Sequence, residues 1–135
     1  MDTYSTFLKS CGMKITPQRV WVYRIVKESG THLSVDEVYQ QVKQHIPAIS
    51  RATVYTTLEL LEGKGLLREI KIDFERSFYE AETESHHHFL CRTCKKIFDI
   101  HMNPCPALTQ KEIEGHTIAD FHGYFYGVCR ECGAR

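Results

Sequence analysis

The chain lacks the features that mark membrane proteins and disulfide-stapled secreted domains. Its 135 residues contain no apolar run near the ~20 residues that a membrane span needs. The N-terminal segment MDTYSTFLKS has no apolar core of a secretory signal, and six cysteines are few for a stapled scaffold of this length. We therefore expect a cytoplasmic protein that contacts no membrane and keeps its cysteines reduced.

The chain also has a net charge of zero, because 17 Lys and Arg side chains balance 17 Asp and Glu side chains. Neither half of the chain is a basic tail, so any nucleic-acid binding must come from a local patch. No linker rich in Pro, Gly or Ser interrupts the chain, yet its halves differ. Helical periodicity dominates residues 1–82, whereas five of the six cysteines lie in residues 83–135. We predict an α+β fold with two domains over these ranges, joined by a short hinge.

Two CxxC pairs stand out among the features that are present, Cys91 with Cys94 and Cys129 with Cys132. Each pair offers two thiolates on one short turn, and two such turns complete the tetrahedral sulfur set that Zn²⁺ prefers. The 34 residues between the pairs exceed the ~15–20 of a compact zinc ribbon. We therefore expect zinc to join two elements of a larger fold, with a disulfide framework as the alternative.

Three helices are expected in the first half. The first, over residues 16–30, starts with Thr at the N-cap and Pro at the first helical position, and Trp21 belongs to its apolar face. The second, over residues 34–46, starts with a capping box of Ser and Glu. The third, over residues 50–63, follows after a short connection. The second and third helices together predict a helix-turn-helix.

Two β-prone runs, at residues 66–72 and 77–80, flank a polar turn and predict a hairpin after the third helix. A helix-turn-helix followed by such a hairpin is a winged helix. One face of the third helix carries side chains that can reach phosphates and base edges in a major groove. These side chains are Arg51, Thr53, Tyr55 and Thr56. An ordinary solvated face or a protein-interaction module is the alternative.

A histidine run in the second half predicts another metal site. Alternation along a strand puts His86 and His88 on one face and His87 on the other. Glu80 and Asp99 lie on either side of this run and supply oxygen ligands, and such a mixed set suits Fe²⁺, Mn²⁺, Zn²⁺ or Ni²⁺. One alternative is a solvated histidine run. Another is a non-haem iron enzyme built on two histidines and Asp99, but no signature of a substrate pocket accompanies them.

Four motifs resemble the ferric uptake regulator family over essentially the whole chain. They are MKITPQR at 13–19, SRATVY at 50–55, HHHFLCRTC at 86–94 and YGVCREC at 126–132. The resemblance implies a dimeric repressor of palindromic operator DNA, not an enzyme, and no small-molecule substrate. It further implies an N-terminal winged helix and a C-terminal α/β dimerisation domain with a structural Cys₄ zinc.

The same resemblance implies a second, regulatory ion, Fe²⁺ or Mn²⁺, bound where the two domains meet. Occupancy of that site would close the dimer onto its operator. The implied ligands are His32, Glu80, His86, His88 and Asp99. The resemblance also assigns Lys14 to the minor groove, Tyr55 to base contacts and Arg51 to phosphates.

Two positions indicate the peroxide-sensing branch of that family. Iron-uptake regulators tend to have Glu where this chain has Asp99, and Arg where it has Thr56. In the peroxide-sensing branch, bound Fe²⁺ reacts with H₂O₂ and its histidine ligands are oxidised, which here would be His32 and His86. Glu80 departs from the pattern, because peroxide sensors usually have Asp there. An iron-uptake regulator, or another metal sensor without peroxide sensing, is the alternative.

The remaining cysteines and histidines receive structural roles. Cys11 and Cys105 have no CxxC partner and are expected to be small buried hydrophobes. A third metal site could draw on further side chains, although surface histidines are the favoured interpretation; the candidates are His87, His101, Glu112, His116 and His122. Residues 104–114 are predicted to form a short amphipathic helix.

Overall fold

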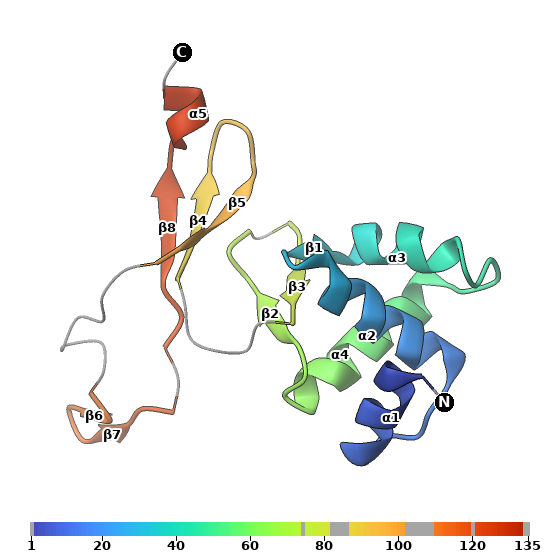
Figure 1. Cartoon of the computed structure of the whole chain (residues 1–135). Helices are drawn as coiled ribbons and strands as arrows, with labels where there is room; N and C mark the ends of the chain where they lie inside the picture. The colour runs from blue at the N-terminus through green and yellow to red at the C-terminus, as the bar shows by residue number, and fades with distance from the viewer. Residues whose placement is uncertain (1, 74, 82–86, 102–109, 120, 134–135) are drawn as a thin grey trace. The chain divides into compact units, whose positions relative to one another are not determined.

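The structure is a computed structural model that describes residues 2–73, 75–81, 87–101, 110–119 and 121–133. The chain divides into two compact units, Met1–Thr83 and Glu84–Arg135. Figure 1 shows the elements of each unit along the chain. Among the described residues, no helix is long and apolar enough to cross a membrane.

Four helices build most of the first unit: α1 (Thr3–Ser10), α2 (Pro17–Ser29), α3 (Val35–Lys43) and α4 (Arg51–Gly63). Their starts follow from local capping. The side chains of Thr16 and Ser50 each accept a hydrogen bond from the backbone N–H of the residue three positions later in the chain. Ser34 forms the predicted capping box with Glu37. The three predicted helices are therefore confirmed, with α3 ending four residues before Pro47. Helix α1 was not predicted.

The core of the first unit lies where α2, α3 and α4 pack together. Val22 and Val26 of α2, Val38 of α3 and Leu58 of α4 are essentially inaccessible to solvent. The apolar face predicted for α2 is buried, as expected, except at Trp21. This side chain is half-buried and its ring stacks on the His45 ring, with the ring centroids 3.7 Å apart. This packing holds α4 against α2 and α3 along its apolar stripe, so the opposite face of α4 is exposed.

A small antiparallel sheet completes the first unit, in the order β1 (Leu33–Ser34), β3 (Phe78–Glu80) and β2 (Arg68–Ile70). Strands β2 and β3 pair as the predicted hairpin, although both are shorter than the β-prone runs. Strand β1 was not predicted, because two residues are too few to give a pattern. The helices and this hairpin confirm the winged helix-turn-helix, and the chain as a whole has the predicted α+β class.

The second unit contains a three-stranded sheet in the order β5 (Ile97–Ile100), β4 (His87–Cys91) and β8 (Tyr124–Gly127). Strands β4 and β5 are antiparallel neighbours, whereas β4 and β8 are parallel. The short helix α5 (Arg130–Gly133) follows β8. Because β4 and β8 run in the same direction, the two CxxC turns that follow them are at the same edge of the sheet.

A separate hairpin of the second unit pairs β6 (Glu112–Ile113) with β7 (His116–Thr117). The two residues between the strands, Glu114 and Gly115, both have positive φ, as a tight hairpin turn requires. The helix predicted over residues 104–114 is therefore wrong over its described C-terminal part. Residues 104–109 of that prediction, with Cys105, lie outside the described residues.

Candidate metal centres and nucleic-acid interface

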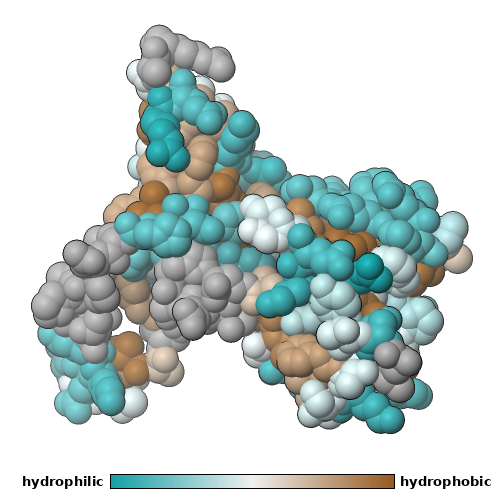
Figure 2. Space-filling model, in the orientation of Figure 1, coloured by the Kyte–Doolittle hydropathy of each residue, from teal (hydrophilic) through white to brown (hydrophobic). Residues whose placement is uncertain are grey.

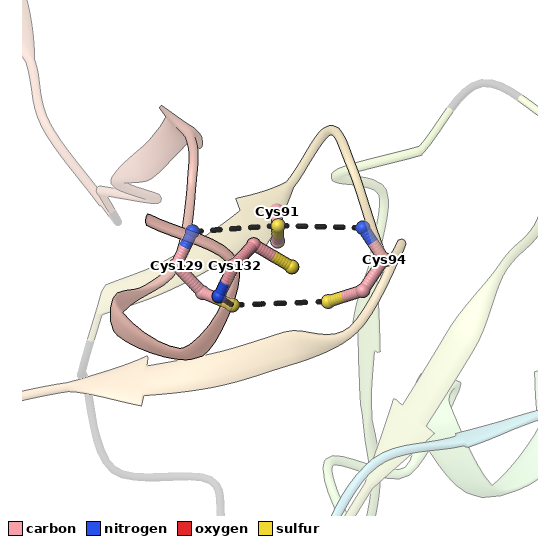
Figure 3. A group of neighbouring side chains, drawn as sticks. All are labelled: Cys91, Cys94, Cys129 and Cys132. Carbon is pink, nitrogen blue, oxygen red and sulfur yellow. Dashed lines mark hydrogen bonds between the residues drawn. The ribbon is translucent and has the colours of Figure 1, made fainter. Parts of the chain in front are cut away.

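Four cysteine sulfur atoms gather at the end of the β4–β8 pair, all within 4.8 Å of one another. Figure 3 shows the side chains of both CxxC turns directed toward a common centre. The sulfur atoms of Cys94 and Cys129 are 3.8 Å apart, far beyond the ~2.05 Å of a disulfide bond. Four sulfur ligands at ~2.3 Å from one zinc ion, in tetrahedral geometry, lie about 3.8 Å from each other. The cluster could therefore hold Zn²⁺ with little rearrangement, as the sequence predicts.

Backbone N–H groups prepare the Cys91 sulfur to carry negative charge. The Cys91 sulfur accepts from the backbone N–H groups of Cys94 and Cys129, each at 3.4 Å, and these bonds lower the pKa of Cys91 to about 5. The Cys132 thiol instead donates to the Cys129 sulfur, which raises the pKa of Cys132 to about 12. Four clustered thiolates repel one another, so full ionisation requires a cation among them. This charge pattern fits a zinc ion.

The first unit brings together two of the residues implied for the regulatory metal. His32 precedes β1, and the antiparallel register of β1 with β3 pairs Leu33 with Tyr79. Continuing that register by one residue puts His32 opposite Glu80. Their side chains are 5% and 4% exposed, with Nε2 of His32 3.3 Å from Oε2 of Glu80. The pair offers one imidazole nitrogen and one carboxylate oxygen.

The second unit brings together another histidine and carboxylate. His88 on β4 is the cross-strand partner of Asp99 on β5, and Nε2 of His88 lies 3.6 Å from Oδ1 of Asp99. His88 is 3% exposed. His87 has its ring near Phe121 and Phe125 instead, so the predicted alternation holds for these two histidines. His86 lies outside the described residues.

Each pair could supply part of the ligand set of a metal ion. Nitrogen and oxygen ligands in equal number suit Fe²⁺ and Mn²⁺ better than soft ions, and both histidines are largely buried. Two ligands are fewer than the four to six that such ions take from a protein and water together. The donor chemistry therefore fits the implied ions, although neither pair completes a site alone.

The exposed face of α4 carries the four side chains predicted to meet DNA. Arg51, Tyr55 and Thr56 are exposed and Thr53 is half-buried. The Thr56 hydroxyl donates to the carbonyl oxygen of Ala52, so only its methyl group and its remaining acceptor capacity face outward. Lys14, in the connection between α1 and α2, is also exposed. All five predicted DNA contacts thus lie in the first unit, none of them in its core.

Tyr55 and Arg51 have protein partners that the sequence reasoning missed. The Tyr55 hydroxyl donates to the Glu59 carboxylate, and this hydrogen bond raises the pKa of Tyr55. The Arg51 guanidinium donates to the Asp36 carboxylate and stacks over the Tyr39 ring, 4.7 Å from its centroid. The spacing of Tyr55 and Glu59, four residues apart on one helix, was a signal for the first partner. The contact of Arg51 with α3 depends on the tertiary fold.

The other histidines and cysteines do not add a site within the described residues. His87, His101, His116, His122 and Glu112 do not gather into a group of three or more potential ligands there. Cys11 is half-buried rather than fully buried. The third metal site was the weaker interpretation of these side chains, and the described geometry gives it no support.

Comparisons with known proteins agree with these features. A model described as the ferric uptake regulator family matches residues 10–126. The peroxide-responsive repressor PerR of Staphylococcus epidermidis is 34% identical over 130 residues, covering 93% of this chain and 85% of that protein. The structure of a Campylobacter jejuni peroxide stress regulator has a TM-score of 0.70 and 32% identity, covering 98% of this chain and 100% of that one. That of the Francisella tularensis ferric uptake regulator with iron has a TM-score of 0.76 and 29% identity, covering 90% and 96%.

Proposed function

Because the chain belongs to the ferric uptake regulator family, whose members are transcriptional regulators and not enzymes, we propose that it is a metal-dependent, peroxide-responsive repressor. In this role it binds palindromic operator DNA as a homodimer in the cytoplasm. The observation that carries the proposal is the presence of one histidine–carboxylate pair in each unit, His32 with Glu80 and His88 with Asp99.

The DNA-binding part of the proposal rests on α4 and the connection before α2. A winged helix places the N-terminal part of its recognition helix in the major groove. Tyr55 contacts base edges, Thr53 and Thr56 contact bases or sugar–phosphate, and Arg51 contacts phosphate. Lys14 enters the minor groove. The exposure of these side chains supports their roles.

The metal-dependent part assigns both pairs, together with His86, to one Fe²⁺ or Mn²⁺ ion. An ion that takes ligands from both units binds best in the arrangement that brings them together. That difference in affinity is the coupling between metal and DNA binding, typically ~1–3 kcal/mol. Zn²⁺ at the four cysteines has a separate, structural role, because an all-sulfur site closed by four ligands has no open position.

The peroxide-responsive part rests on the relatives and on Asp99. The similar Staphylococcus protein is a peroxide-responsive repressor, and the similar Campylobacter structure is a peroxide stress regulator. Fe²⁺ supplies the redox chemistry with H₂O₂ when it is bound. The chain supplies the oxidisable imidazoles of His32 and His86, each of which would gain one oxygen atom. Mn²⁺ would support DNA binding without this oxidation.

The homodimer is supported by apolar side chains on the second unit. Phe125 and Tyr126 are successive residues of β8, so they point to opposite faces of the sheet, and they are 44% and 43% exposed. Val128, directly after the strand, is 58% exposed. Figure 2 shows brown surface on the part of the molecule that carries β4, β5 and β8 in Figure 1. Each face of this small sheet therefore exposes apolar surface that a second copy of the chain could cover.

The test is operator binding by zinc-loaded protein under anaerobic conditions, with Fe²⁺ or Mn²⁺, before and after a small dose of H₂O₂. We expect binding with either ion and loss of binding after peroxide only in the Fe²⁺ sample. Mass spectrometry should then find one added oxygen on a peptide that contains His32 or His86. The matched control is protein that holds Zn²⁺ but neither Fe²⁺ nor Mn²⁺ and receives the same dose of H₂O₂.

Two other outcomes lead elsewhere. Binding that survives peroxide in the Fe²⁺ sample identifies an iron- or manganese-dependent uptake regulator. This is the second candidate function, and it is supported by the similarity to the Francisella ferric uptake regulator with iron. Absence of DNA binding in every metal state would remove the repressor function altogether.

A further inference from the structure

Arg51, the first residue of α4, has two partners on α3. Its guanidinium donates to the carboxylate of Asp36, and it stacks over the ring of Tyr39 with its central carbon 4.7 Å from the ring centroid. The ammonium group of Lys43 lies 5.5 Å from the centroid of the same ring. Two cations thus lie near one half-buried aromatic ring, and one of them, Arg51, is also paired with the Asp36 carboxylate beside the N-terminus of the recognition helix.

The ion pair is exposed on both sides. The side chains of Arg51 and Asp36 retain 58% and 68% of their accessible surface. Exposed pairs of this kind contribute little free energy and are screened by salt. A phosphate group carries a full negative charge and accepts two parallel hydrogen bonds from a guanidinium. It can therefore take the place of the Asp36 carboxylate when the recognition helix meets DNA.

We propose that Asp36 competes with operator phosphate for Arg51 and so lowers the affinity of this chain for DNA. The inference deepens the proposed function and rests on it. Asp36 holds the Arg51 charge in the free protein, and DNA binding requires this ion pair to be exchanged for a phosphate contact. Because phosphates are the same at every sequence, the competition lowers binding to operator and random DNA by the same factor.

Tyr39 has a different role in this arrangement. Its ring attracts Arg51 through the cation–π interaction, which does not depend on the Asp36 carboxylate. The guanidinium can therefore stay near α3 while its hydrogen bonds pass from Asp36 to phosphate. Lys43, on the same ring, adds a second positive charge to the surface that phosphate approaches. Asp36 is thus the one member of the group that opposes DNA binding.

The test is DNA binding by the Asp36→Asn variant of the full chain, loaded with Zn²⁺ and Mn²⁺, on operator and on random duplex. Asn has nearly the same shape, and Asp36→Ser provides a second neutral residue suited to the first turn of a helix. The matched control is Glu28→Gln. It breaks another exposed ion pair of the same unit, with Arg24 at 3.1 Å, and involves neither α3 nor α4. Each variant is also made in an Arg51→Gln background.

We expect Asp36→Asn to tighten binding by about 1.4- to fivefold per DNA-contacting unit, which is the range of an exposed ion pair. A dimer that uses both units would then gain about two- to 25-fold. The gain should be equal on both duplexes, should shrink as salt rises, and should vanish in the Arg51→Gln background. Glu28→Gln should change little.

Three results would overturn the inference. Unchanged or weaker binding of Asp36→Asn and Asp36→Ser would mean that Asp36 orients Arg51 or has no effect. A gain that persists in the Arg51→Gln background, or one that Glu28→Gln reproduces, would mean general repulsion between carboxylates and DNA. Failure of the unaltered chain to bind any DNA would overturn the proposed function together with this inference, and so is distinguishable from the first two results.

Discussion

Replacing Cys94 with Ser tests how far the second unit depends on zinc. Among the described residues of that unit, the buried apolar side chains are Leu90, Cys91 and Cys129. Two of these three are proposed zinc ligands, so Leu90 is the one aliphatic side chain of that set. Its burial contributes about 1.5–3 kcal/mol. The first unit, by contrast, holds every member of the main apolar cluster.

The zinc contribution is much larger than this apolar term. Apparent binding free energies for structural zinc in small domains are about 10–16 kcal/mol at neutral pH, and this energy stabilises only the folded state. Serine is a poor zinc ligand, so Cys94→Ser removes one of four bonds and the closed tetrahedral geometry with it. The variant is expected to lose zinc, the structure of the second unit and the dimer.

The assay combines zinc content, size-exclusion chromatography and limited proteolysis of the Cys94→Ser variant. Peptides from residues 84–135 should be released quickly, while the fragment that contains α1 to α4 resists cleavage. Cys11→Ser is the matched control, because Cys11 is half-buried and does not belong to the cluster. A zinc-free Cys94→Ser dimer whose second unit resists protease as the unaltered chain does would refute the reasoning.

Three further predictions address single side chains. Ser50→Ala removes the cap of α4, so the free energy of unfolding of the first unit should fall by about 1 kcal/mol. Its melting temperature should fall by roughly 4–8 °C, and an unchanged melting curve would contradict the capping role. Tyr55→Phe should reduce the preference for operator over random DNA without changing the salt dependence of binding; equal loss on both duplexes would argue against base contact. His88→Ala should weaken Mn²⁺ binding measured by calorimetry, while the zinc content stays constant. The control is His116→Ala, which removes an exposed histidine of β7 and should leave Mn²⁺ binding unchanged.

The features that could be predicted from the sequence are those set by local interactions. Caps at Thr16, Ser34 and Ser50 act within three residues, and the structure has all of them. A CxxC turn is also local, because both thiols of a pair lie on one turn. Helix α1 carried such a signal too, since the Asp2 side chain accepts the backbone N–H of Ser5. It was missed because eight residues give too short a periodicity to recognise.

The features that could not be predicted depend on contacts between distant residues. Strand β1 has only two residues, and it is a strand because it pairs with β3 more than forty positions later. The contact between Arg51 and Asp36 spans 15 residues and requires α3 and α4 to pack first. One miss was local: strand β6 was predicted as the end of the helix over residues 104–114, because the positive-φ turn at Glu114 and Gly115 lacks the common Asn-Gly or Asp-Gly signal. Glu80 and Asp99 were proposed as ligands from their places around the histidine run, whereas His32 came only from the resemblance, because it lies opposite Glu80 only once β1 pairs with β3.

The distribution of the histidine–carboxylate pairs explains why one ion can act as a switch in the proposed function. If all the ligands lay in one unit, metal would stabilise that unit and leave the DNA-binding arrangement unchanged, since a ligand shifts only equilibria between states that it binds unequally. With His32 and Glu80 in one unit and His88 and Asp99, together with the proposed ligand His86, in the other, neither unit alone offers the full ligand set. Affinity for metal then depends on the units coming together. By linkage, operator DNA that favours the same arrangement must raise the metal affinity by the factor by which metal raises the DNA affinity.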